Sequence, residues 1–220
     1  RQRQMCIRDR QGTSPETAAL LSNQNFRQAL NYGFDRSATV NAVNPGYKAY
    51  NRLVDSNFAG PDGGKFVDEY PVETVPLSGD VDKAKEYLAA AMEELGYSDV
   101  SQLPQLELIT WDTSEQKLLL ETIIDQWKQN LGLENIQLTQ YVIGTAIGSF
   151  YDLSYDLFAI TWETDVLPTD IMEAMVTGGE VNYGIWSDAQ FDSLVEQAIN
   201  ELEPDKQAEL TAQAEQIFLD

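Results

Sequence analysis

Residues 106–132, LELITWDTSEQKLLLETIIDQWKQNLG, contain the clearest structural pattern in the sequence. The first residues of this stretch, together with Gln105, form the segment QLELIT (105–110), which predicts a β-strand. The remainder predicts a long helix that ends at Gly132. A capping-box spacing marks the start of this helix, and two pairs fit it: Asp112 with Glu115, and Thr113 with Gln116. A strand followed directly by a helix is typical of α/β proteins.

The same alternation continues on both sides of this unit. Further strands are predicted at 135–141 and 155–161, where short apolar and β-branched runs occur. Helices are predicted at 22–43 with a break at Gly33, and at 80–97, 168–179, 187–202 and 204–219. Between 44 and 79, Gly, Pro, Asp and Asn interrupt every pattern, which predicts a long irregular segment. The sequence therefore predicts an α/β fold with helices packed on a sheet.

The composition excludes several classes of partner and enzyme. The 220 residues carry 36 acidic and 14 basic side chains, a formal net charge of -22, and such a field repels nucleic acids and anionic lipid surfaces. Histidine is absent, which excludes the Ser-His-Asp and Cys-His systems and the HExxH zinc site. Loops 55–60 and 60–65 do not have the spacing of calcium or phosphate loops. We expect neither a metal ion nor a cofactor.

The first ten residues, RQRQMCIRDR, differ in composition from the rest of the chain. They hold four of the 14 basic residues and the single cysteine, Cys6, but no apolar run that would make them a signal peptide. The run MCIRDR resembles the translated read-through of a transposase adapter used in DNA sequencing libraries. We therefore interpret residues 1–10 as an artefact of sequence assembly, with the native N-terminus and any targeting segment missing.

Two acids follow the last predicted strand. The stretch DLFAITWETDVLP, residues 156–168, leads from apolar residues to Trp162, Glu163 and Asp165. On one face of a strand, Glu163 and Asp165 would have the spacing of the acid and base of a glycoside hydrolase, so a carbohydrate-active enzyme is one alternative. Structural roles are also open: Trp162 as a core residue, and Asp165 as the cap of a helix that begins at Pro168.

Five segments in this order resemble the extracellular solute-binding proteins of peptide-importing ABC transporters, family 5, and the resemblance covers residues 20–220. They are NQNFRQALNYGFDR (23–36), VDKAKEYLAAAMEELGY (81–97), LELITWDTSEQKLLLETIIDQWKQNLGL (106–133), YDLFAITWETDVLPTDIM (155–172) and GIWSDAQFDSLVEQA (184–198). The first carries the family's Phe-Arg-x-Ala-Leu and Asp-Arg residues. The resemblance implies a lobe like that of type II periplasmic binding proteins, with a mixed sheet flanked by helices.

The resemblance also implies how a ligand is held. In oligopeptide binders of this family, an acid shortly after the strand-end tryptophan pairs with the α-ammonium group of the ligand, and Asp165 takes that position here. A charged hydrogen bond of this kind does not depend on the side chains of the peptide. Trp162 would wall the site, and the backbone of Thr161 to Thr164 would pair with the peptide in the manner of a strand.

For the other candidate site residues, the sequence leaves more than one role open. Glu163 is the alternative anchor, and Trp111 and Tyr183 are expected either to line the binding cleft or to pack in the core. Ala159 stands where some family members carry a basic residue, so a clamp for the ligand carboxylate is not expected at that point. The family includes nickel, haem and sugar binders; the missing histidines argue against the first two, and a sugar-binding member stays an alternative.

The resemblance finally implies a place in a larger system. Family members have two lobes that enclose the ligand, and residues 20–220 resemble the second lobe, truncated at both ends and without the first lobe. The parent protein would be a monomer and not an enzyme. It would lie at the extracellular face of the cytoplasmic membrane or in the periplasm, and would deliver its peptide to an ABC permease and ATPase.

Overall fold

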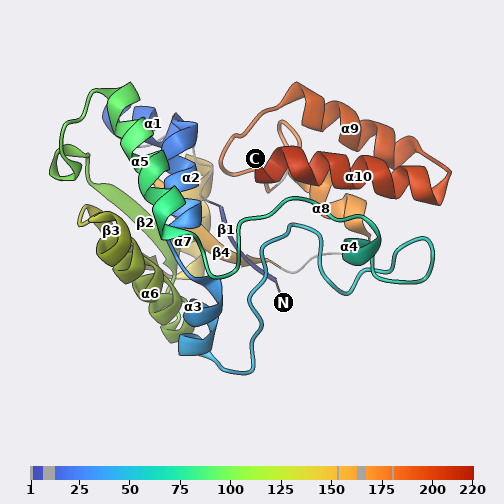
Figure 1. Cartoon of the computed structure of the whole chain (residues 1–220), viewed down its shortest axis with the longest axis horizontal. Coiled ribbons are helices and arrows are strands. Elements are labelled where there is room, and N and C mark those ends of the chain that lie inside the picture. Colours follow the sequence, from blue (N-terminus) through green and yellow to red (C-terminus); the bar gives the residue numbers. More distant parts are fainter. Residues whose placement is uncertain (1, 7–12, 153, 163–166, 180) are drawn as a thin grey trace. The chain divides into compact units, whose positions relative to one another are not determined.

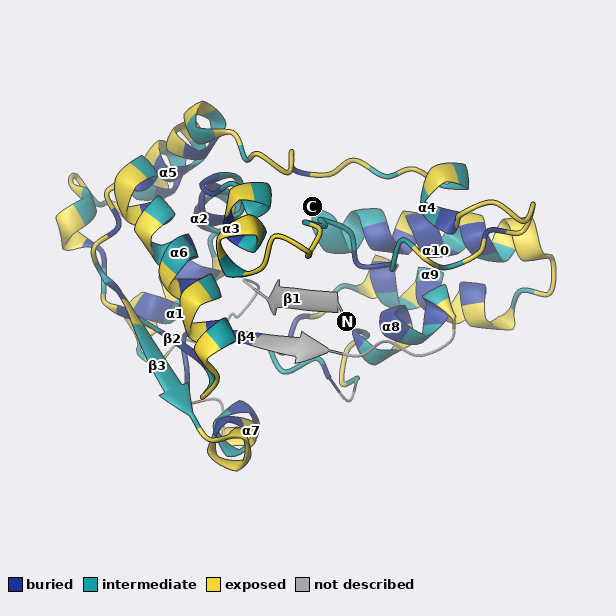
Figure 2. Ribbon diagram, turned by 90° about the horizontal axis from the view of Figure 1, so that it is seen from below, coloured by how far each residue is buried: buried dark blue, intermediate teal, exposed yellow. Residues whose placement is uncertain are grey.

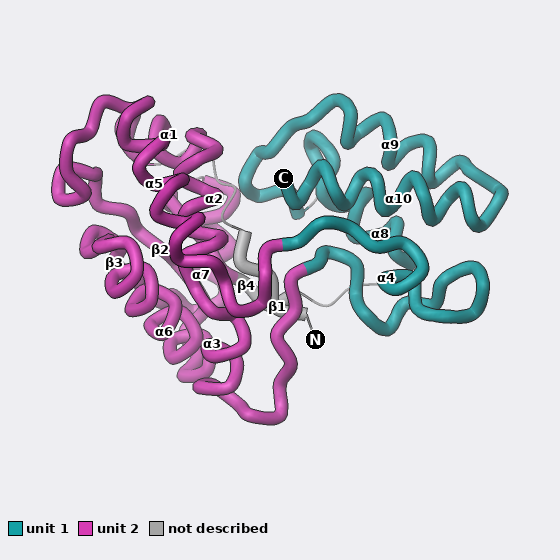
Figure 3. The backbone as a smooth tube through the Cα atoms, viewed as in Figure 1, with its two compact units in different colours: residues 1–4, 52–74, 161–220 teal, residues 5–51, 75–160 magenta. Residues whose placement is uncertain are grey.

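A computed structural model describes residues 2–6, 13–152, 154–162, 167–179 and 181–220, and for residues 2–6 and 160–162 it describes the backbone alone. The chain divides into two compact units (Figure 3). The unit that we name the sheet unit comprises residues 5–51 and 75–160, and the helical unit comprises residues 1–4, 52–74 and 161–220.

The strands form one sheet in the order β1-β4-β2-β3 (Figure 1). Their bounds are Gln2–Cys6 for β1, Leu106–Trp111 for β2, Ile136–Tyr141 for β3 and Leu157–Trp162 for β4. Strand β2 pairs in parallel with β3 on one side and with β4 on the other. The predicted α/β class is confirmed. Strand β1 lies within residues 1–10, whose origin as an assembly artefact stays a prediction.

Helices and one face of the sheet enclose the main core. The helices are α1 (Pro15–Ser22), α2 (Gln24–Tyr32), α3 (Arg36–Val43), α5 (Val81–Leu95) and α6 (Ser114–Leu131). Leu106, Leu108 and Leu157 of the sheet share one hydrophobic cluster with Leu30 of α2 and Trp127 of α6, and all five are nearly inaccessible. The strand residues in this cluster alternate with others, as the two-residue period of a strand requires.

Helix α7 (Ile143–Asp152) covers the opposite face. Its Phe150 packs on Phe158 of β4 with ring centroids 5.0 Å apart, and Tyr155 packs edge-on against both rings. The other side of α7 is exposed (Figure 2) and includes Ile143 and Ile147. The sequence did not predict α7 or α1.

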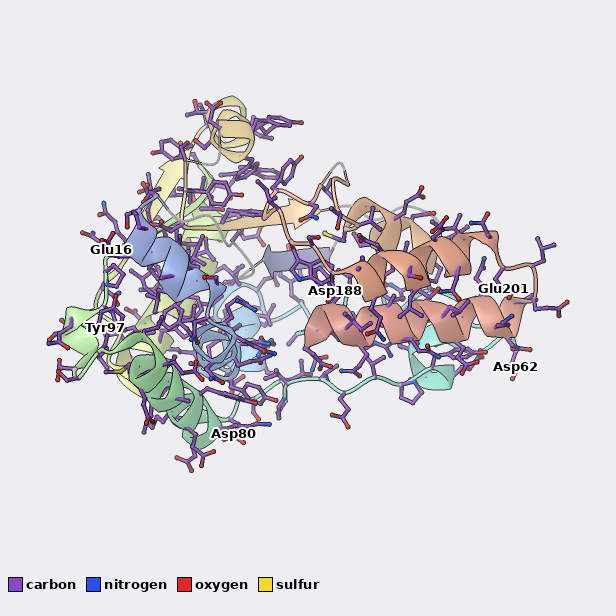
Figure 4. The ribbon with its side chains drawn as sticks, turned by 90° about the horizontal axis from the view of Figure 1, so that it is seen from above. Glu16, Asp62, Asp80, Tyr97, Asp188 and Glu201 are labelled. Carbon is purple, nitrogen blue, oxygen red and sulfur yellow. The ribbon has the colours of Figure 1, made fainter. Side chains whose placement is uncertain are left out.

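Capping residues begin several of the predicted helices. Asn23, Asp80 and Thr113 each accept a backbone N–H of the first turn of α2, α5 and α6. Asp188 does the same for α9 (Ala189–Asn200), and Figure 4 labels Asp188 and Glu201 at the two ends of that helix. These side chains satisfy donors that no residue of the helix can pair.

Helix α6 fixes the corner between α2 and α3. The indole N–H of Trp127 donates to the carbonyl of Leu30 at 2.8 Å, and Asn130 donates to the carbonyl of Gly33 at 2.8 Å. Gln126 accepts the backbone N–H of Asp35 at 2.7 Å. Three neighbouring side chains of one helix thus satisfy polar groups of a bend that is distant in sequence, so the bend depends on tertiary contacts.

The helical unit contains α4 (Phe66–Glu69), α8 (Pro168–Ala174), α9 and α10 (Pro204–Leu219). Phe66 of α4, Ile171 of α8, Phe191 of α9 and Ala212 of α10 belong to one buried cluster. Apart from α4, the irregular segment predicted between residues 44 and 79 is confirmed.

A buried ion pair joins the irregular segment to α10. The carboxylate of Glu215, which is inaccessible, accepts from Arg52 at 2.6 Å and from the backbone N–H groups of Leu53 at 2.7 Å and Val54 at 3.0 Å. Arg52 also donates to the carbonyls of Val67 and Tyr70. Because the remaining lone pairs and N–H groups find partners, the pair can stay charged away from water.

We expect Glu215→Ala to lower the free energy of unfolding by about 3–5 kcal/mol, because it leaves the Arg52 charge buried without its partner. Glu121→Ala is the matched control: Glu121 pairs with Lys117 at 3.7 Å, but half of each side chain is exposed. This control should cost at most about 0.5 kcal/mol. Urea unfolding of both variants measures the difference, and equal losses would contradict a buried pair.

Gly79 and Gly96 give a second matched comparison. Their φ angles are similar, 69° and 77°, but a Cβ on Gly79 would lie 2.5 Å from the carbonyl oxygen of Phe34, whereas nothing lies within 4 Å of a Cβ on Gly96. Gly96→Ala should cost about 1 kcal/mol through the left-handed backbone alone. Gly79→Ala should cost about 1–3 kcal/mol more through overpacking. If the urea midpoints shift equally, the backbone at Phe34 can move away from the added methyl group at little cost.

Candidate functional site

Parallel pairing brings the carboxyl ends of β2, β3 and β4 to one edge of the sheet. Trp111, the last residue of β2, is the register partner of Tyr141, the last residue of β3. On the other side, Thr110 pairs with Ala159 of β4. In open α/β sheets, ligands bind outside this edge. We therefore take the edge at Trp111 and Tyr141 as the candidate site.

Hydrogen bonds brace the backbone at this edge. Asp112 donates its N–H to the carbonyl of Tyr141 at 2.8 Å, so the β2–β3 ladder continues one residue beyond β2. The side chain of Gln140 donates to the carbonyl of Trp111 at 3.2 Å and to that of Thr113 at 3.1 Å. The turn from β2 into α6 is thereby tied to β3, and Trp111 is held on a rigid support.

The indole of Trp111 has an unusual environment. The side chain as a whole is half-buried, but its Nε1 is inaccessible and has no hydrogen-bond acceptor among the described residues. An unpaired buried N–H costs about 1–3 kcal/mol. The indole of Trp127 in the core shows the ordinary arrangement, because its N–H reaches the carbonyl of Leu30. Trp111 thus carries a hydrogen-bond donor at the sheet edge whose acceptor is not supplied by the described part of the chain.

Apolar residues continue from this edge. Tyr141 is half-buried, and the next two residues, Val142 and Ile143, are 64% and 56% exposed. Exposed aliphatic side chains beside an aromatic strand end make a surface that suits apolar groups of a ligand. Sequence analysis missed Tyr141, although it ends a predicted strand in the same way as Trp111 ends its own.

The sequence-predicted residues after β4 are only partly described. Thr161 and Trp162 end β4 in the sheet as expected, with the backbone alone described. Glu163, Thr164 and Asp165 lie outside the described residues.

The structure also bears on two alternatives that the sequence leaves open: Asp165 as the cap of α8, and Tyr183 as a core residue. The N-cap position of α8 is occupied by Leu167, whose N–H donates to Asp170 at 2.8 Å, and Pro168 takes the predicted first helical position. In the helical unit, Tyr183 is half-buried and packs against the hydrophobic cluster. A cleft-lining role for Tyr183 stays a prediction.

The described residues contain neither a candidate metal site nor a candidate membrane-spanning helix. No group of three or more His, Cys, Asp or Glu side chains that could hold a metal ion occurs among them. None of the described helices is long and apolar enough to cross a membrane.

Residues 11–183 match the family model described as bacterial extracellular solute-binding proteins, family 5 Middle. The chain belongs to this family. Among curated relatives of this family 5 chain, the oligopeptide-binding protein OppA of Bacillus subtilis (strain 168) is 29% identical over 203 residues, 91% of the chain and 36% of the relative. The dipeptide-binding protein DppE of the same organism is 26% identical over 90% of the chain and 35% of the relative. The chain therefore spans about a third of the length of these relatives.

Solved structures show the same fold. A crystal structure of a peptide ABC transporter's peptide-binding protein superposes with a TM-score of 0.80 at 23% identity, covering 94% of this chain and 91% of that one. The OppA of Listeria monocytogenes bound to peptide gives a TM-score of 0.77 at 23% identity, covering 91% of this chain and 37% of that one. The predicted lobe of the periplasmic-binding-protein type is thus confirmed.

The family pattern in residues 26–36 has a structural basis. Phe26, Ala29 and Leu30 are completely buried in the main core. Arg27 donates to the carbonyls at the end of α1, and Asp35 caps α3. These residues hold α1, α2 and α3 together, so the pattern that identifies the family is a packing motif.

Substitution of the two tryptophans tests the unpaired donor. Trp127→Phe should lower the free energy of unfolding by about 2–3 kcal/mol, because it removes buried area and leaves the carbonyl of Leu30 unpaired. Trp111→Phe should change it by less than about 1 kcal/mol, because the lost area is offset by removal of an unpaired N–H. Urea unfolding checks both. Equal losses would mean that the N–H of Trp111 is satisfied in the folded chain.

Proposed function

We propose that the chain is the ligand-binding lobe of a solute-binding protein that captures oligopeptides for an ABC importer. The observation that carries this proposal is the parallel register that sets Trp111 beside Tyr141 at the carboxyl edge of the sheet. The names of the family relatives, an oligopeptide-binding and a dipeptide-binding protein, support peptides as the ligand class. Peptide backbones supply carbonyl acceptors at every residue.

In this proposal, four features of the chain contact different parts of the peptide. The carboxylate of Asp165 pairs with the α-ammonium group, as the resemblance to the family implies. The indole of Trp111 lines the site beside the peptide. Tyr141 and Val142 offer apolar contact, and the backbone at Thr161 pairs in the manner of an added strand. The contacts of Asp165 and Thr161 are with the peptide main chain, so many sequences would be accepted.

The remainder of the function follows from this role. The relatives are solute-binding proteins, and we propose that this chain likewise binds its ligand without chemical change. The full-length protein would act outside the cytoplasmic membrane and pass its peptide to a permease and an ATPase. Because the chain spans about a third of its relatives, we expect it to bind peptides weakly by itself.

The amino-terminal anchor is tested by titrating the 220-residue chain with short peptides that have either a free or an acetylated amino terminus, followed by NMR. Acetylation should weaken binding by about 1.5–3 kcal/mol, which is typical of a hydrogen bond to a charged group. Asp165→Asn should cost as much with the free peptides. The two changes should not add, because they remove the same interaction.

Glu163→Gln is the matched control, since Glu163 is the alternative anchor and the acid of the alternative glycosidase. It should leave peptide binding unchanged. If Glu163→Gln abolishes the difference between free and acetylated peptides, the anchor is Glu163. If free and acetylated peptides bind the original chain alike, or if sugars bind and peptides do not, the proposed ligand class is wrong.

A further inference from the structure

Strand β3 forms one end of the described sheet (Figure 2). It pairs with β2 in an unbroken register, from Ile136 opposite Leu106 to Tyr141 opposite Trp111. On its other side, β3 has no neighbouring strand among the described residues. A strand in this position presents a row of backbone N–H and C=O groups to any chain that can lie beside it.

The hydrogen bonds at both ends of the β2–β3 ladder show which backbone groups of β3 point outward. The N–H of Leu106 donates to the carbonyl of Asn135 at 2.8 Å. At the other end, the N–H of Asp112 donates to the carbonyl of Tyr141 at 2.8 Å. Because backbone groups alternate in direction along a strand, every second residue from 135 to 141 faces β2. The residues between them direct their N–H and C=O groups away from β2, and these are Ile136, Leu138 and Gln140.

These outward backbone groups, which we name the open edge of β3, are without a described partner. None of them is hydrogen-bonded to another residue in the part of the chain that the structure describes. Leu138 and Gln140 are only half-buried, so another chain can reach them. Edge strands are usually protected by charged residues, proline or a bulge, but IQLTQY (136–141) has neither charge nor proline, and its register has no bulge.

The two faces of β3 define the side chains that suit an added strand. Leu138 lies on the face of the main core and packs against it. On the opposite face, Gln137 is exposed and Thr139 is half-buried. A strand beside β3 would therefore place apolar residues next to Leu138 and polar residues next to Gln137 and Thr139. Its sequence would alternate between the two kinds.

The charge of the chain indicates which strand this is. Two copies of the chain, each with a net charge of -22, repel one another, which disfavours pairing of β3 with β3 of a second copy. The same field attracts a cationic strand. Asp112, which is exposed beside the end of β3, adds an acid close to the open edge. Lysine or arginine at the polar positions of the added strand would complement this charge.

We propose that the open edge of β3 is a second peptide-binding surface, which binds an extended cationic strand with alternating apolar and polar residues. The outward N–H and C=O groups pair with the main chain of this strand, and Leu138 packs against its apolar side chains. This surface goes beyond the proposed function. It needs no α-ammonium group, because it contacts the interior of a strand.

Hydrogen exchange of the 220-residue chain, followed by NMR, tests the open edge. Without peptide, the amides of Leu138 and Gln140 should exchange at least about tenfold faster than that of Thr139, which faces β2. The peptide is a heptamer that alternates lysine and valine, with an acetylated amino end and an amidated carboxyl end. At saturation it should slow exchange of Leu138 and Gln140 by a factor on the order of ten.

Two results of this experiment would overturn the inference. One is slow exchange of Leu138 and Gln140 without peptide, because the edge is then already covered, by a second copy if the protection increases with protein concentration. The other is exchange that the peptide does not change. Because the acetylated peptide cannot use an amino-terminal anchor, this experiment and the titration of free and acetylated peptides fail independently of one another.

Two N-methylated forms of the heptamer test the strand pairing. Only every second residue of an added strand turns its N–H toward β3, the valines in an antiparallel strand and the lysines in a parallel one. Methylation of one set should weaken binding by a factor on the order of ten, whereas methylation of the other set should leave it unchanged. Equal affinities of the two forms would contradict strand pairing.

A pair of variants tests the same contact from the side of the chain. Leu138→Pro removes an N–H that points away from β2, so the β2–β3 ladder remains. Leu138→Ala is the matched control, because it loses the leucine side chain but keeps the N–H. Leu138→Pro should bind the heptamer several-fold more weakly than Leu138→Ala, and equal binding would overturn the inference. If Leu138→Pro does not fold, the N-methylated peptides decide.

Discussion

Backbone hydrogen bonds between parallel strands hold β2 against β3 on one side and against β4 on the other, and the rest of the sheet unit depends on this pairing. Parallel strands need a crossover between them, so α6 and α7 must pack on the sheet. Their faces follow from the register, because each strand alternates its side chains between the two sides. The same register places Trp111 beside Tyr141, and the candidate site is therefore a direct product of the pairing.

A buried carboxylate supports each of the two units. In the sheet unit, Asp156 precedes β4 and is 1% exposed; it accepts the N–H of Glu107 in β2 at 2.9 Å and two donors of Thr13, the nearer at 2.6 Å. In the helical unit, Glu215 accepts from Arg52 and two backbone N–H groups. In both places a buried charge joins segments far apart in the sequence, and it is tolerated because hydrogen bonds replace its hydration. Such groups specify which segments meet, since a shifted partner would leave the charge unpaired.

The sequence predicts those parts of the structure whose cause is local. The starts of α2, α5 and α6 follow from Asn23, Asp80 and Thr113, because a cap and the N–H groups that it accepts are close in sequence. Helix α7 was missed because Gly144, Gly148 and three β-branched residues give it a low helix propensity; it depends instead on the packing of Phe150 against Phe158. Helix α1 had a usable signal, Ser14 before Pro15, which was not recognised.

The candidate site likewise has one part that local sequence predicts and another that depends on tertiary contacts. Trp111 was a candidate from the sequence because it follows a clear strand, whereas its proximity to Tyr141 depends on a pairing of residues that are 30 positions apart in the sequence. Residue type predicts which positions can bear a function, and tertiary contacts decide which of them do.

The strongly negative charge of the chain bears on the choice of anchor. A net charge of -22 attracts the amino end of any peptide and repels its carboxyl end, which would orient a ligand before contact. At physiological ionic strength this field is screened beyond about 8 Å, so it guides the encounter but does not fix the bound position. Exposed acids such as Asp112 at the sheet edge take part in the field. Fixing the amino terminus therefore requires one carboxylate in direct contact with it, and the proposed role of Asp165 supplies a short-range interaction that the overall charge cannot replace.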